Sequence, residues 1–179
     1  MNLPFFTVGH SNLSLDAFVD LLHGPDVQRL VDIRTIARSR ANPQFNEDAL
    51  SQSLPAQDIT YERLAALGGL RGKSRHLSPE VNGFWSNASF HNYADYATTP
   101  AFRAGLDHLI AEGRDQRCAI MCAESVWWRC HRRIVSDHLI ARGERVFHIM
   151  GAGRVVPATL TPGAMVRPDG SVIYPIPNN

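Results

Sequence analysis

Short apolar runs that alternate with helix-like segments constrain the fold of this chain more than any other feature. The runs are Phe5–Gly9, Leu30–Ile33, Cys118–Cys122 and Arg145–Ile149, and each ends in a polar or glycine-containing segment. Between such runs, apolar residues recur with helical spacing, for example from Leu15 to Leu22. This alternation is typical of parallel strands joined by crossover helices. The sequence therefore predicts an α/β fold of three layers, with a mainly parallel sheet and helices on both of its faces.

The length and composition fit a single domain. The chain has 179 residues, of which 44% are hydrophobic and 20% are charged, so it can bury a substantial core. We expect residues 1–153 to form the α/β domain and residues 154–179 to form a C-terminal tail. Asp169-Gly170 is expected to turn a small hairpin in that tail. Residues 63–90, which are rich in glycine and charge, are expected to form a long loop.

Several classes of protein are excluded by the same sequence. No apolar run approaches the roughly 18 residues that cross a bilayer, so we expect no membrane partner. Met1–Pro4 carries no basic charge before the first apolar run, so we expect no secretory signal. The three cysteines are crowded into residues 118–130, which favours reduced thiols over a disulfide framework. Together these features predict a cytoplasmic protein.

The basic residues are unusual in type rather than in number. The net charge is only +1, so no global field attracts nucleic acid, but Lys73 is the one lysine among 18 basic residues. Arginine suits planar contacts with phosphate, sulfate or carboxylate groups. A genome that replaces lysine by arginine everywhere would give the same total. The positions of the arginines must therefore distinguish the two explanations.

Polar side chains gather where the predicted strands end. In open α/β sheets, ligands bind beyond the carboxyl ends of the strands. The candidate site residues at that edge are His10, Ser11, Asp32, Arg34, Arg38, Ser39, Cys122, Glu124, Cys130, His131 and Arg132. We predict a site there for an anionic small molecule that carries a phosphate, sulfate or carboxylate group.

Cys122 is the candidate nucleophile, because it lies between a strand and a helix. The helix N-terminus and a neighbouring arginine, Arg129 or Arg132, are expected to lower the pKa of its thiol, whereas Glu124 nearby would oppose this. In the alternative interpretation, Cys122 is a small packed side chain beneath an anion site. His10 is a further catalytic candidate, with capping of a turn as its structural alternative.

Three arginines, Arg34, Arg38 and Arg132, are expected to clamp the anion. Asp32 or Glu124 would orient these arginines or act as a general base. Asp32 and Arg34 are two residues apart on a strand and so share a face, which makes a mutual salt bridge the structural alternative.

A metal site is a weaker hypothesis. Cys122, Cys130 and His131 are ligand types that bind metals, but their spacing matches no structural zinc pattern. We therefore expect no metal and no cofactor.

The chain resembles the family catalogued as domain of unknown function 488. The resemblance rests on Thr7–Ser11, Asp32-Ile33-Arg34, Leu67-Gly68-Gly69, Cys122-Ala123-Glu124 and Cys130-His131-Arg132. It implies an α/β fold and the same site residues, and it implies no established reaction. A weaker likeness to rhodanese-like sulfurtransferases rests on the order of strands around Asp32, Cys122 and His148. The bulky, acidic Glu124–Trp128 departs from the small-residue loop of those enzymes.

Three functions follow as hypotheses. The first is an enzyme that acts on an anionic small molecule, with Cys122 as its nucleophile if the reaction is covalent. The second is a nucleic-acid-binding or repair-associated module, in which Arg71, Lys73 and Arg75, with Arg38 and Arg40, follow phosphates while Trp85 or Trp127 stacks on bases. The third is a non-catalytic ligand-binding or interaction domain. The sequence does not indicate the oligomeric state.

Overall fold

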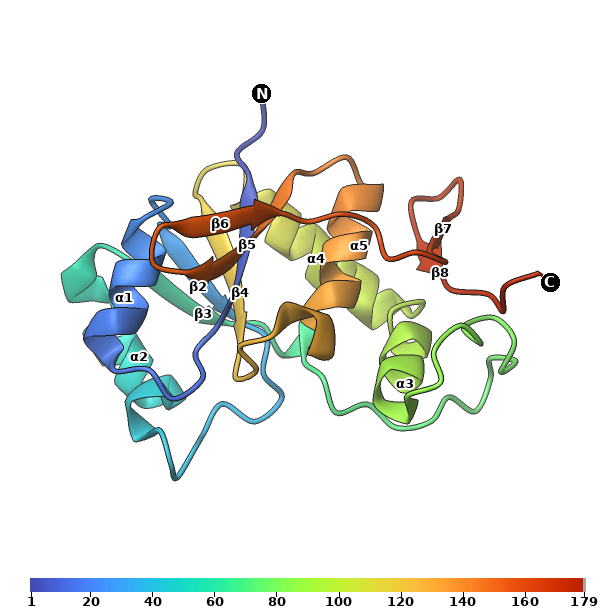
Figure 1. Cartoon of the computed structure of the whole chain (residues 1–179), viewed down its shortest axis with the longest axis horizontal. Coiled ribbons are helices and arrows are strands. Elements are labelled where there is room, and N and C mark those ends of the chain that lie inside the picture. The colour runs from blue at the N-terminus through green and yellow to red at the C-terminus, as the bar shows by residue number, and fades with distance from the viewer. Residues whose placement is uncertain (179) are drawn as a thin grey trace.

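The six-stranded sheet of the protein has the order β3-β2-β4-β1-β5-β6 (Figure 1). A computed structural model describes residues 1–178. Neighbouring strands run parallel except for β5 and β6, which confirms the predicted, mainly parallel sheet. The strands are β1 (Phe5–Gly9), β2 (Arg29–Asp32), β3 (Thr60–Arg63), β4 (Cys118–Cys122), β5 (Val146–Gly151) and β6 (Arg154–Pro157).

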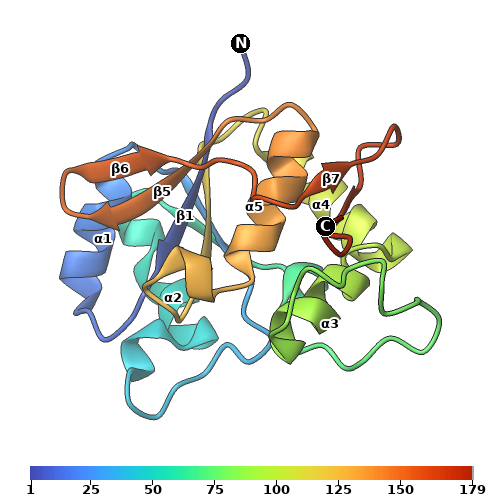
Figure 2. The ribbon, with the colours of Figure 1, turned by 45° about the vertical axis from the view of Figure 1, so that its right-hand side comes forward.

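Helices cover both faces of this sheet, as the alternation of segments predicted. Helices α1 and α2 lie on one face, and α4 and α5 lie on the other, while α3 stands further out beside α4 (Figures 1 and 2). The helices are α1 (Leu15–His23), α2 (Glu47–Ser53), α3 (Ala88–Tyr96), α4 (Pro100–Glu112) and α5 (Arg132–Ala141). No helix in residues 1–178 is long and apolar enough to cross a membrane.

Alternation along β1 divides the core into two halves. Phe6 and Val8 pack in the cluster that holds Phe18 of α1, whereas Phe5 packs in the cluster that holds Leu109 of α4. Successive side chains of a strand point to opposite faces, so a strand that is apolar throughout is buried on both sides. Burying each of these side chains contributes roughly 1.5–3 kcal/mol before the entropy cost of ordering it.

Two elements were not expected from the sequence. Helix α3 begins inside the predicted loop, where Asn87 caps it by accepting a hydrogen bond from the backbone N–H of Phe90. Its composition is too polar to give a clear apolar stripe, and it becomes a helix by packing Tyr93 and Ala94 into the core. Strand β6 extends the main sheet as its antiparallel edge. A separate two-stranded sheet, at the hairpin expected around Asp169-Gly170, pairs β7 (Met165–Val166) with β8 (Val172–Ile173).

Candidate functional site

The carboxyl ends of β2, β4 and β1 lie side by side and form the base of the site. Strand β1 continues into α1 on one face, whereas β4 continues into α5 on the other. Neighbouring strands that diverge in this way leave a crevice at the sheet edge, where α/β proteins bind ligands. The backbone N–H groups of His10 and Ser11 donate to the carbonyls of Cys122 (3.0 Å) and Ala123 (3.0 Å), which ties the two loops together.

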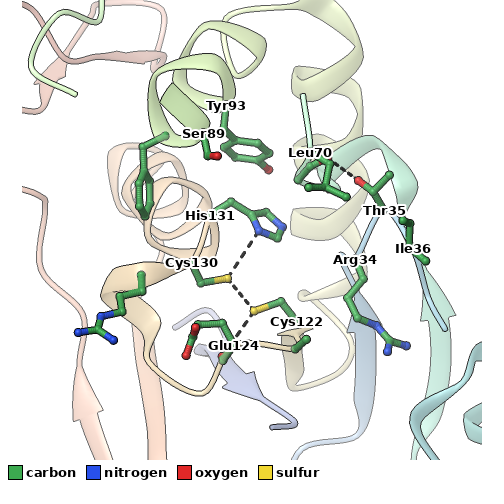
Figure 3. A pocket seen from close by; sticks show the side chains of 14 residues that line it. Arg34, Thr35, Ile36, Leu70, Ser89, Tyr93, Cys122, Glu124, Cys130 and His131 are labelled. Atoms are coloured by element: carbon green, nitrogen blue, oxygen red, sulfur yellow. Dashed lines mark hydrogen bonds between the residues drawn. The ribbon is translucent and has the colours of Figure 1, made fainter. Parts of the chain in front are cut away.

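A cavity of about 330 Å³ opens between the ends of β2 and β4, and α3 and the start of α5 form its other walls (Figure 3). We call it the thiol pocket, because two cysteine side chains line it. Its lining residues come from five segments of the chain: Arg34, Thr35, Ile36, Gly69, Leu70, Ser89, Phe90, Tyr93, Cys122, Ala123, Glu124, Arg129, Cys130 and His131.

Cys122 and Cys130 meet in this pocket. Their Sγ atoms lie 2.6 Å apart, the side chains are only 4% and 5% exposed, and both thiols are free. Burial, together with the hydrogen bond and the negative charge of Cys130, raises the pKa of Cys122 well above its ordinary value. The expected lowering of the pKa of Cys122 is therefore wrong. A buried thiol beside a second sulfur that carries the charge keeps its proton.

Cys130 is the thiol whose pKa is lowered. Burial alone would raise it, but hydrogen bonds from Cys122 and His131 and the charges of His131 and Arg132 hold the pKa of Cys130 well below its ordinary value. The backbone N–H of Arg132, in the first turn of α5, also donates to the Cys130 sulfur (3.4 Å). A helix N-terminus favours a negative charge, so the position of Cys130 before α5 acts in the same direction as its lowered pKa.

His131 is held with one ring nitrogen toward the sulfur. Its Nε2 lies 2.9 Å from the carbonyl oxygen of Ile33, and its Nδ1 lies 3.6 Å from Cys130 Sγ (Figure 3). A carbonyl only accepts, so Nε2 carries the hydrogen and Nδ1 is left to exchange a proton with the thiol. A Cβ at Gly69 would come within 3.1 Å of that same Nδ1, so this glycine lets the chain approach the imidazole closely.

Arg132 lies beneath the pocket and does not reach its surface. The side chain is 1% exposed, and its Nη2 donates to the carbonyl of Glu124 (2.6 Å). Within residues 1–178 no carboxylate forms a salt bridge with its guanidinium, and its Nε has no hydrogen-bond partner. A buried cation needs a counter-charge, and the charge of Arg132 is one of the causes that lower the pKa of Cys130. Arg132 therefore fits the electrostatic support of the thiolate better than the predicted direct clamping of a ligand.

Asp32 and Arg34 form the mutual salt bridge that the sequence left open. The guanidinium binds the carboxylate through Nε (2.8 Å) and Nη2 (2.6 Å), and both side chains are buried. Tyr61 donates to the same carboxylate (2.6 Å). Nη1 of Arg34 donates a hydrogen bond to Nε2 of His10 (3.2 Å). The other ring nitrogen of His10, Nδ1, donates to the carbonyl oxygen of Ser11 (2.7 Å). His10 is therefore neutral, in keeping with a pKa that burial lowers.

A second, more polar cavity of about 470 Å³ adjoins the thiol pocket across Arg34. The remaining candidates meet there: His10, Ser11, Arg38 and Ser39 all line it. Arg38 is exposed, and within residues 1–178 its side chain forms no hydrogen bond. The hydroxyl of Ser39 accepts a hydrogen bond from the backbone N–H of Asn42 (3.1 Å). Nine of the eleven predicted residues thus line one or both of these adjoining cavities, and the other two, Asp32 and Arg132, are buried beneath them.

Glu124 lines the rim of the thiol pocket without contacting an arginine through its carboxylate. Its Oε1 accepts a hydrogen bond from the backbone N–H of Val126 (3.0 Å). Among residues 1–178, no group of three or more His, Cys, Asp or Glu side chains is arranged to hold a metal ion.

Sequence reasoning missed one wall of the pocket. Phe90 and Tyr93 come from α3, which had been expected to lie partly in a loop, and Leu70 comes from the same region. Tyr93 stacks edge-on against His131, with the ring centres 4.9 Å apart. The Leu67-Gly68-Gly69 motif was the signal that this region belongs to the site.

Two of the side chains proposed to bind nucleic acid, Trp85 and Arg71, make contacts within the protein instead. Trp85 is only 8% exposed and stacks on Phe90. Arg71 donates to the carbonyls of Gly68 and Ala65 and lies over the ring of Tyr96. Neither side chain is presented for stacking on bases or for following a phosphate backbone.

Residues 14–139 match the family model described as Domain of unknown function DUF488. The chain belongs to this family. The DUF488 match spans β2, β4, both pocket cysteines and the first turns of α5, so it includes the parts that form the thiol pocket. No curated protein and no solved structure matches the chain. The DUF488 assignment confirms the resemblance and assigns no reaction.

Proposed function

We propose that this DUF488 protein is a thiol-dependent enzyme that acts on an anionic small molecule in the thiol pocket, with the Cys130 thiolate as nucleophile. The observation that carries the proposal is the environment of Cys130 Sγ. One thiol, one imidazole nitrogen and one backbone N–H surround this sulfur, at 2.6, 3.6 and 3.4 Å. Each of these groups favours the thiolate, which is the reactive form of cysteine.

The hydrogen-bond partners of the two ring nitrogens of His131 support a catalytic role for this side chain. Activated nucleophiles sit beside a base that a third group orients, and here the Ile33 carbonyl fixes Nε2 while Nδ1 faces the sulfur. His131 then holds the proton of Cys130 in the resting enzyme and returns it to a leaving group. Cys122 donates a hydrogen bond to the thiolate, in place of the nucleophilic role that its position in the sequence suggested.

An anionic substrate is supported by two arginines of the pocket. Arg129 is exposed, and within residues 1–178 its side chain forms no hydrogen bond or salt bridge, so its guanidinium is available to a carboxylate, sulfate or phosphate. Arg34 lies at the opposite side of the pocket, where its salt bridge with the buried Asp32 holds the guanidinium in place and balances much of its charge. Leu70, Phe90 and Tyr93 provide an apolar wall for the remainder of the molecule.

Alkylation kinetics test this proposal directly. Iodoacetamide is neutral and iodoacetate is anionic, and both report thiolate reactivity when the modified cysteine is located by mass spectrometry. We expect Cys130 to react at pH 7 faster than free cysteine, with a higher iodoacetate-to-iodoacetamide rate ratio than free cysteine shows. Cys118→Ser is the matched control and should leave both rates unchanged. Burial raises the pKa of that thiol to about 12, and Cys118 lies at the N-terminal end of β4, whereas the pocket lies at the C-terminal end.

Three results would count against the proposal. The first is alkylation of Cys130 only after the protein is unfolded. The second is a rate that His131→Asn leaves unchanged, since the variant removes the proton acceptor. The third is an iodoacetate-to-iodoacetamide rate ratio equal to that of free cysteine. That result would contradict the proposed preference for anions but not the proposal that Cys130 is the nucleophile.

A further inference from the structure

We propose that Cys122 is the resolving thiol of Cys130 and that the pocket reduces small organic disulfides that carry carboxylates, so that turnover passes through a Cys122–Cys130 disulfide. This inference rests on the proposed function, because it requires Cys130 to be the nucleophile. It adds a second catalytic residue and a substrate class to that function.

The placement of the two sulfurs carries the inference. Eight positions separate Cys122 and Cys130 in the chain, yet β4 and the turn before α5 bring their Sγ atoms to 2.6 Å. A disulfide bond is about 2.05 Å long, so only a small rotation of the side chains separates the dithiol from the bonded form. A cysteine that served only to donate a hydrogen bond could be replaced by serine. The second sulfur, however, can also attack a bond that forms at the first.

The chemistry of the pair balances as two exchange steps. The Cys130 thiolate attacks one sulfur of the substrate disulfide, which forms a mixed disulfide and releases the first thiolate, and this thiolate takes the proton held on His131. The mixed disulfide removes the negative charge of Cys130 that helped to keep Cys122 protonated, so the Cys122 thiol can give up its proton and attack Cys130 Sγ, which breaks the mixed disulfide. The second thiolate leaves with the proton of Cys122. The substrate gains two electrons and becomes two thiols, while the two cysteines lose two electrons and become a disulfide.

The pocket favours a small charged disulfide as the oxidant. A cavity of about 330 Å³ holds one arm of a small molecule, and the two cysteines are at most 5% exposed. A folded protein could not bring its own disulfide to a sulfur buried to this degree. Arg129 at the pocket is the group that would distinguish a carboxylate-bearing disulfide from a neutral one. A dithiol reductant must return the pair to the reduced state.

Mass spectrometry of the intact reduced protein after exposure to oxidised glutathione tests the inference. The wild type and Cys118→Ser should both lose two hydrogens and retain no glutathione, with the new bond mapped to Cys122 and Cys130. The variants Cys122→Ser and Cys122→Ala should each accumulate one glutathione on Cys130. Cys130→Ser should retain none. The thermal transition of each variant, measured alongside, shows whether it is folded.

The substrate class has its own measurement. We expect Arg129→Gln to slow the reaction with oxidised glutathione about two- to fivefold, the effect of losing one exposed ion pair, and to leave the reaction with neutral 2-hydroxyethyl disulfide unchanged. Equal slowing with both disulfides would overturn the assignment of Arg129.

The outcomes separate the two proposals. A wild-type protein that keeps a stable glutathione adduct on Cys130 would overturn the resolving role of Cys122 while supporting Cys130 as nucleophile. No reaction in any folded variant, with either disulfide or with iodoacetamide, would overturn both.

Discussion

Replacing Gly9 by alanine should destabilise the protein at the point where the site is assembled. An added Cβ would lie 1.9 Å from the carbonyl oxygen of Glu124 and 2.7 Å from Cα of Ser125, and both are backbone atoms. Ordinary contacts are at least about 3.4 Å, so β1 and the 123–125 loop must separate by more than about 1 Å. Overpacking of this kind costs roughly 1–3 kcal/mol, and weakening the hydrogen bond from His10 N–H to the Cys122 carbonyl adds about 1 kcal/mol.

We therefore expect Gly9→Ala to lower the free energy of unfolding by about 2–4 kcal/mol and the Tm by roughly 5–15 °C. Urea unfolding followed by circular dichroism measures the first quantity. Gly151→Ala is the matched control, because an added Cβ there meets no atom within 4 Å, and it should change the stability by less than about 1 kcal/mol. If Gly9→Ala were as stable as Gly151→Ala, the close approach of β1 to the loop would not be present in the protein.

Two further predictions concern stability. Tyr174→Phe removes the hydroxyl that donates to Oδ2 of Asp137 (2.6 Å) and leaves this carboxylate, which is 1% exposed, with one fewer hydrogen-bond donor. Urea unfolding should show that the free energy of unfolding falls by about 1–3 kcal/mol. An unchanged midpoint would show that this hydrogen bond does not anchor the tail. Burial lowers the pKa of His138 to about 3 and that of His148 to about 4, and nearby arginine charges add to both shifts. The unfolded chain binds these protons near pH 6.5, so the free energy of unfolding should fall as the pH is lowered from about 6.5 toward 4. His148→Gln should show a shallower fall over that pH window than the wild type. An equal slope would contradict a neutral, buried His148.

The sequence predicted the fold because its signals are local. Each apolar run that follows a glycine or polar segment fixes a strand, and capping residues such as Ser14 and Thr99 begin helices through hydrogen bonds within three residues. Helix α3 was missed for the opposite reason. Its helical state depends on Tyr93 packing against residues far away in the chain, and no local stripe reveals that contact.

The alternation of segments by itself determined the layers of the protein and the edge of the sheet at which the chemically active side chains gather. Only the tertiary structure distinguished Cys130 from Cys122. Cys122 ends β4 and Cys130 lies just before α5, and neither position in the sequence shows which groups surround the sulfur. The difference comes from non-local contacts. The Ile33 carbonyl orients His131 toward Cys130 across 98 positions of the chain, and the buried charge of Arg132 supports the anion there. A pKa depends on the charges and dipoles that surround an atom in space, and the order of residues does not give those distances.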